Sequence, residues 1–174
     1  MKTRLVVIAS LLAGAPLVPV SAQRPLHLGL SAGFTPSLEG SVDRGYRGSH
    51  AQAALEFAPA DRRMGLRLDG FVHNMTRIRY PGLLGRTNII GGTASALVGL
   101  GPLHRSLTPY LLAGAGTYRT EYGQLPADWH FGISAGGGVR FQTGPIAVFA
   151  EARLHQIADG STPRLVPLSF GIRF

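Results

Sequence analysis

Four histidines are the first residues of this sequence that could carry out chemistry. His50, His73, His130 and His155 lie near the ends of stretches in which apolar residues alternate with small or polar ones. Imidazole titrates near neutral pH and binds metal ions, so the four could form a metal site or a pH-sensitive rim. No spacing forces them to converge. We therefore interpret them as polar interior residues close to water, and we predict no metal and no cofactor.

Seven charged residues share the parity of these histidines: Glu56, Arg67, Asp69, Arg140, Glu151, Arg153 and Arg173. An isolated charge in a narrow interior is costly, so we expect these residues to pair. Glu56 with Arg67 is one expected pair, and Glu151 with Arg153 and Arg140 is the other set. A serine hydrolase would need a serine activated by a histidine that an acid orients. Ser134, near His130, is on the interior face, so we predict no catalytic residue.

Eight alternating stretches must position these side chains. We expect strands at residues 26–34, 49–57, 64–73, 88–100, 108–118, 130–141, 146–155 and 164–174. Successive side chains of a strand point to opposite faces, so each stretch has an apolar face and a small or polar face. The faces of the fifth are ambiguous because Leu111 and Leu112 adjoin. Pro167 cannot donate to a ladder, so the last strand should bulge there or be regular only from Leu168.

The pattern predicts an all-β fold, an eight-stranded antiparallel up-and-down transmembrane β-barrel. The strand number is even, and most strands have about the 9–11 residues that cross a bilayer at a tilt. Long connections alternate with short ones, as extracellular loops do with periplasmic turns. Outward aromatics at the strand ends would form two girdles, with Phe57, Phe141 and Phe174 at one rim and Phe34 and Phe131 at the other.

The start of the chain predicts export. A basic segment, an apolar run from Leu5 to Val20 and the small residues of Val20-Ser21-Ala22 are typical of a signal peptide at residues 1–22. A membrane anchor is disfavoured because the run is short and contains prolines. Residues 23–174 would then be one barrel domain. The sequence has no cysteine, so no disulfide can stabilise an exported fold of this kind.

The last strand carries a family resemblance. Leu168, Phe170, Ile172 and Phe174 alternate with Ser169, Gly171 and Arg173. This resembles the closing-strand signal that the barrel-assembly machinery of the bacterial outer membrane reads. With the signal peptide and the strand number, the chain resembles small eight-stranded barrels of the OmpX/OmpA transmembrane type. The resemblance implies an outer-membrane location, contact with outer-membrane lipid and lipopolysaccharide, and a monomer.

Three functions follow as alternatives from this reading. The first is a non-enzymatic barrel with a structural or surface-interaction role, whose lumen is plugged by ion pairs because eight strands enclose a filled interior. The second is a small channel. The third is a lipid A-modifying enzyme, although Gln156, Ile157 and Ala158 follow His155, so the His-x-Ser-Asn pattern of lipid A deacylases is absent. A soluble lipocalin-like binder is disfavoured, because its outer surface would be too apolar.

The basic residues indicate a surface that binds anionic groups rather than a nucleic-acid-binding site. Arg77, Arg79 and Arg86 lie in an expected extracellular loop, residues 74–87, that contains no acid. They could hold lipopolysaccharide phosphates or an acidic host polymer through charge-assisted hydrogen bonds. Lys2 is the only lysine, and no basic run or aromatic platform is present. We therefore expect no nucleic-acid partner.

Overall fold

The structure is a computed structural model that describes residues 25–36, 46–58, 63–79, 83–101, 106–122, 126–158 and 164–174. For residues 46, 47, 77–79, 83–86 and 122 it describes the backbone alone. The expected signal peptide lies outside the described residues. Within these ranges, no helix is long and apolar enough to cross a membrane.

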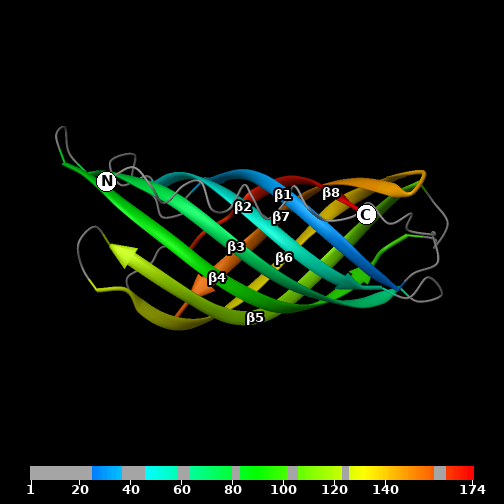
Figure 1. Cartoon of the computed structure of the whole chain (residues 1–174), viewed down its shortest axis with the longest axis horizontal. Helices are drawn as coiled ribbons and strands as arrows, with labels where there is room; N and C mark the ends of the chain where they lie inside the picture. Colours follow the sequence, from blue (N-terminus) through cyan, green and yellow to red (C-terminus); the bar gives the residue numbers. More distant parts are fainter. Residues whose placement is uncertain are drawn as a thin grey trace, which may run out of the picture.

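The described residues form a closed antiparallel barrel of eight strands in sequence order (Figure 1). The strands are β1 (Leu26–Pro36), β2 (Tyr46–Phe57), β3 (Met64–Arg79), β4 (Leu83–Gly99), β5 (Leu107–Tyr122), β6 (Asp128–Thr143), β7 (Ile146–Ile157) and β8 (Leu168–Arg173). β1 pairs with β8 and closes the sheet, so the barrel has no free edge. This confirms the fold predicted from the alternation.

The two ends of the barrel differ. At the turn end, β6 and β7 are joined by a tight turn in which Gly144 has φ +62°, a conformation that favours glycine. At the hairpin end, β3, β4, β5 and β6 extend past β2 and β7, as the left side of Figure 1 shows. We use these two names for the ends below.

Large apolar side chains cover the outside. Leu66, Leu68, Phe131 and Phe170 expose about 60% of their surface, and Trp129 exposes 64% at the hairpin end. A monomer in water rarely exposes a continuous apolar surface of this extent. In a barrel that contacts lipid, the same surface is buried in hydrocarbon.

Glycines opposite aromatic rings allow the narrow interior to fill. Four inward aromatics lie directly across a strand pair from a glycine: Phe71 and Tyr118 from Gly91, Tyr110 from Gly138 and Phe149 from Gly171. A Cβ on Gly91 would come within 2.8 Å of the Phe71 ring, and one on Gly171 within 2.6 Å of the Phe149 ring. The abundance of glycine in these strands therefore reflects packing inside the lumen.

The predicted strands were too short at the hairpin end. β3 continues to Arg79 and β4 starts at Leu83, so the expected loop at residues 74–87 is largely a paired hairpin. Polar residues such as Asn74 and Thr87 suggested a loop because the apolar alternation stops there, but backbone pairing continues. The fifth strand is now assigned: Leu112 is buried in the lumen and Leu111 is exposed. The last strand is regular from Leu168, with an isolated bridge at Leu165.

Candidate functional site: the filled lumen

A buried ion-pair tetrad spans the middle of the lumen. Arg67 Nε lies 2.7 Å from Asp69 Oδ1, and its Nη1 lies 2.7 Å from Glu151 Oε2. Arg153 completes the ring, with Nη1 2.8 Å from Asp69 Oδ2 and Nη2 3.0 Å from Glu151 Oε1. All four side chains expose 3% or less. Tyr110 adds a hydrogen bond by donating to Glu151 Oε2 over 2.8 Å.

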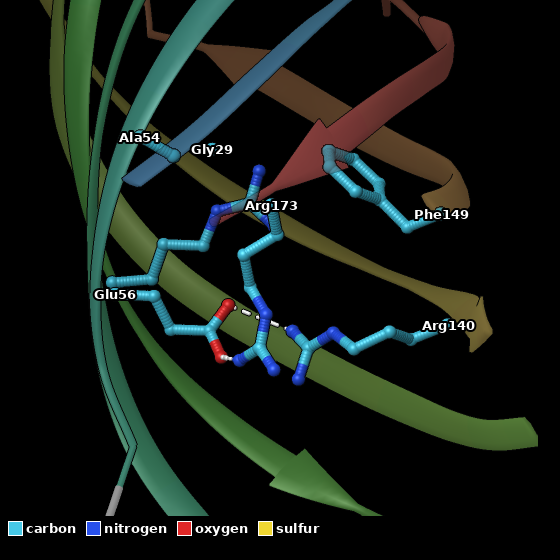
Figure 2. A pocket seen from close by; sticks show the side chains of 7 residues that line it. Gly29, Ala54, Glu56, Arg140, Phe149 and Arg173 are labelled. Atoms are coloured by element: carbon cyan, nitrogen blue, oxygen red, sulfur yellow. Dashed lines mark hydrogen bonds and ion pairs between the residues drawn. The ribbon is translucent and has the colours of Figure 1, made fainter. Parts of the chain in front are cut away.

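A second ionic group lies at the turn end. Glu56 accepts a hydrogen bond from Arg140 at one carboxylate oxygen and from Arg173 at the other, both over 2.7 Å (Figure 2). The two arginine side chains expose 14% and 13%, so this triad is closer to water than the tetrad. One carboxylate therefore serves two guanidinium groups.

The pairing differs from the prediction in two respects. Glu56 and Arg67 are direct register partners, yet each forms its ion pairs with other residues. Arg67 reaches across the lumen to β7, and Glu56 is reached from β6 and β8. The barrel is narrow enough for a long side chain to span it, so adjacency along one sheet does not determine the partners. Glu151 pairs with Arg153 as expected, but Arg140 pairs with Glu56 instead.

Three of the four predicted histidines come together above the tetrad. The ring centroids of His50 and His73 are 5.2 Å apart, and those of His73 and His155 are 6.0 Å apart. Thr35 Oγ1 lies 3.2 Å from His50 Nδ1 and 3.1 Å from His73 Nδ1. A hydroxyl has one proton, so it can donate to only one of these nitrogens. In this arrangement the other ring must carry its proton on Nδ1. His130, on β6, is half-buried and makes no ring contact with these three among the described contacts.

An apolar cluster closes the hairpin end of the lumen. Met75, Ile89, Ile157 and Leu165 are each 2% exposed or less and pack with the rings of Phe71 and Tyr118. We call Met75, Ile89, Ile157 and Leu165 the apolar seal. The sequence pattern did not reveal the seal, because two of its members, Met75 and Ile157, lie in segments expected to be loops. Met75 has the same inward parity as His73, and this parity was the signal that could have revealed the seal.

A small cavity at the turn end, lined by Arg140, Phe149 and Arg173 among others, has a volume of about 10 Å³ open to water (Figure 2). That is about the space of one water molecule. The tetrad and the apolar seal together fill the lumen above this cavity.

A serine and a histidine meet in the lumen. Ser169 Oγ lies 2.8 Å from His50 Nε2, and both residues are buried. Ser134 is also buried and faces the lumen, opposite His155 in the register. These hydroxyl groups point away from the apolar outer face. Among the residues that the structure describes, no group of three or more His, Cys, Asp or Glu side chains is arranged to hold a metal ion.

The remaining predicted site residues lie at the two ends. The backbones of Arg77, Arg79 and Arg86 belong to β3 and β4, with Arg86 opposite Thr76, and their side chains are outside the description. In the closing strand, Phe170 and Ile172 face outward. Leu168 follows the same parity, and the N–H of Phe174 donates to the carbonyl of Leu28 over 2.9 Å.

Comparison with known proteins shows which solved structures share this fold. No family model matches the sequence, and no curated protein matches it. Solved structures that are similar to it over most of both chains include the following three. Neisserial surface protein A has 18% identity and a TM-score of 0.63, covering 86% of this chain and 96% of its own. Ail of Yersinia pestis, in complex with the heparin analogue sucrose octasulfate, has 17% identity and a TM-score of 0.52, covering 86% and 99%. The outer membrane enzyme PagL has 14% identity and a TM-score of 0.52, covering 85% and 98%. The chain therefore has the fold of the small eight-stranded outer-membrane β-barrels, the architecture that its sequence predicts.

Proposed function

We propose that this protein is an integral, non-enzymatic barrel of the bacterial outer membrane, exported by its first 22 residues, with a structural or surface-interaction role. The observation that carries this proposal is the filled lumen. Four buried charges cross-link β3 and β7 through the middle of the barrel, and the apolar seal closes the hairpin end. The apolar outer face supports contact with outer-membrane lipid, and the chain acts as a monomer.

Single-channel recording tests the filled lumen against the channel alternative. Purified mature protein is folded in detergent, its compact unboiled form is verified on a gel, and it is inserted in planar bilayers. We expect no discrete conductance from protein whose insertion is verified by protease protection in matched vesicles. Reproducible steps would favour a channel and overturn the plug. A protein that is folded and soluble without detergent would overturn the membrane assignment itself.

The hairpin of β3 and β4 carries Arg77, Arg79 and Arg86, and we call it the basic hairpin. Its position at one end of the barrel favours a surface-interaction role. The register brings Arg47 of β2 opposite Thr76, and Thr76 lies opposite Arg86, so three neighbouring strands carry basic residues at the hairpin end. Ail, a fold neighbour, was solved with a sulfated sugar. We propose that this hairpin holds anionic groups, in the first place the phosphates of lipopolysaccharide.

Binding of lipopolysaccharide by the folded barrel tests this role. The variant Arg77→Gln/Arg79→Gln/Arg86→Gln should bind more weakly, and its binding should depend less on salt. Arg119→Gln is the matched control, because Arg119 is already paired with Glu121 over 3.0 Å on the outer face of β5. Equal binding by the wild type and the triple variant would remove the hairpin from the proposal.

The absence of catalysis is part of the proposal and has its own test. The Ser169–His50 contact is inside the lumen, where an acyl chain in the membrane cannot reach it without opening the barrel. Because one fold neighbour is an enzyme, lipopolysaccharide from cells that express the protein should be analysed by mass spectrometry. We expect unchanged lipid A. Loss of an acyl chain that Ser169→Ala restores would show that the barrel is a hydrolase.

A further inference from the structure

We propose that the turn end of the lumen is a binding site for one small monovalent anion of about the size of chloride. The site is the cavity lined by Gly29, Ala54, Glu56, Arg67, Arg140, Phe149 and Arg173. Its position is distinct from that of the basic hairpin, which lies at the opposite end of the barrel.

Charge balance is the first argument. In the tetrad, two arginines face two carboxylates, so its formal charge is neutral. In the triad, Arg140 and Arg173 share Glu56, which leaves one positive charge without a counterion among the described pairs. Tyr110 cannot compensate, because it is a neutral ring beneath the Arg140 guanidinium, 5.1 Å from its centroid. An uncompensated charge in a partly buried lumen favours a bound anion.

Free donors are the second argument. Arg67 lines the cavity and is 3% exposed, and its Nη2 has no hydrogen-bond partner in the described part of the chain. Nε of Arg140 is likewise buried and has no partner there. Buried guanidinium donors without acceptors are costly, and both of these arginines line the cavity that an anion would occupy.

The volume of the cavity is the third argument, and it limits the size of the ligand. Gly29 and Ala54 are register partners on β1 and β2, and Gly29 is also opposite Arg173 on β8. Because Gly29 has no side chain and Ala54 has only a methyl group, this wall of the cavity in Figure 2 is low. A volume of about 10 Å³ accepts one water-sized particle. A single chloride ion fits this scale better than phosphate or a carboxylate, which have several heavy atoms.

The test is anion-specific stability at constant ionic strength. The folded barrel is unfolded thermally in mixtures of sodium chloride and sodium gluconate of constant total concentration, because gluconate is too large for the cavity. A ligand that binds only the folded state raises the midpoint with its concentration. We expect a saturable rise with chloride and with bromide. An unchanged midpoint across the series would overturn the site.

Variants of the cavity locate the effect. Arg173→Gln should weaken apparent chloride affinity roughly tenfold, because it removes the positive charge that Glu56 leaves without a counterion. Glu56→Gln should strengthen it, because it removes the only carboxylate that lines the cavity. Gly29→Ala changes no charge and adds a Cβ 3.5 Å from that of Ala54, an ordinary contact, so it should fold and bind more weakly. Arg119→Gln, on the outer face, is the control and should not change the response.

Bromide soaked in a crystal gives the position independently. An anomalous peak between Arg67 and Arg140, together with weaker anion response in Arg173→Gln or Gly29→Ala, would support the site. A peak without any anion-dependent midpoint would show an adventitious ion only and overturn it. If Arg173→Gln does not fold, Gly29→Ala and Glu56→Gln still decide, since they must shift the affinity in opposite directions.

Discussion

Neutralising Glu151 should be among the most damaging single changes in the lumen. Its carboxylate accepts from Arg67 and Tyr110 at one oxygen and from Arg153 at the other, over 2.7, 2.8 and 3.0 Å. Glu151→Gln keeps the size of the side chain but leaves two buried guanidinium groups with one carboxylate. Breaking a buried pair by removing one partner costs about 3–5 kcal/mol. We expect the free energy of unfolding to fall by that amount.

The assay is reversible urea unfolding in phospholipid vesicles, followed by the fluorescence of Trp129, the only tryptophan. Glu56→Gln is the matched control, because Glu56 also serves two arginines, but these are 13–14% exposed. Water partly screens the two arginine charges that Glu56→Gln leaves unpaired. We therefore expect Glu56→Gln to lower the free energy of unfolding by less than Glu151→Gln does.

A double-mutant cycle separates the ion pair from other effects. Glu151→Gln combined with Arg67→Gln should cost less than the sum of the single changes, by roughly 0.5–3 kcal/mol, because the second change removes a charge already left unpaired. A cost below about 1 kcal/mol for Glu151→Gln, or strict additivity in the cycle, would refute the view that the tetrad is a dry and mutually dependent unit.

Three further predictions address the lipid face, the packing and the closing strand. Leu68→Arg should cost about 2–4 kcal/mol in vesicles, as charges near the middle of a lipid-facing surface do, and a negligible cost would contradict lipid contact. Gly132→Ala should cost about 1–3 kcal/mol in the same urea assay, since its Cβ would lie 2.7 Å from the Tyr118 ring, whereas Gly70→Ala has nothing within 4 Å and should be nearly neutral. Deleting Phe174 should reduce the amount of heat-modifiable barrel in bacterial outer membranes, with little effect on refolding in detergent. Normal assembly in cells would remove Phe174 from the proposed signal for the assembly machinery.

The alternation of apolar and polar residues along the sequence predicts most of the architecture. A period of two over eight stretches identifies the strands and their faces, because each inward position of a narrow barrel needs a small or polar residue. It failed in β5, where Leu111 and Leu112 adjoin. There the glycines at 114 and 116 and the tyrosines at 110 and 118 share one parity, and they would have resolved the faces.

The partners inside the lumen are beyond what register alone can predict. Neighbouring strands bring Glu56 opposite Arg67, but the flexible guanidinium groups select carboxylates across the barrel, as Arg67 does with Glu151. The convergence of His50, His73 and His155 has the same origin. These residues meet because the closed barrel brings β7 to the opposite side of the narrow lumen from β2 and β3. The spacing of the histidines along the sequence cannot predict this closure.

The layers of the lumen imply an asymmetric response to solvent. The triad at the turn end is partly open, whereas the tetrad and the apolar seal are dry. A small ion can therefore enter from the turn end without disturbing the fold. Passage through the barrel needs at least one buried pair to break, at about 3–5 kcal/mol, so an open form would be populated by at most roughly one molecule in 10² to 10⁴. Anion binding and conduction are thus separable: the first needs only the mouth of the lumen, and the second needs both dry layers to rearrange.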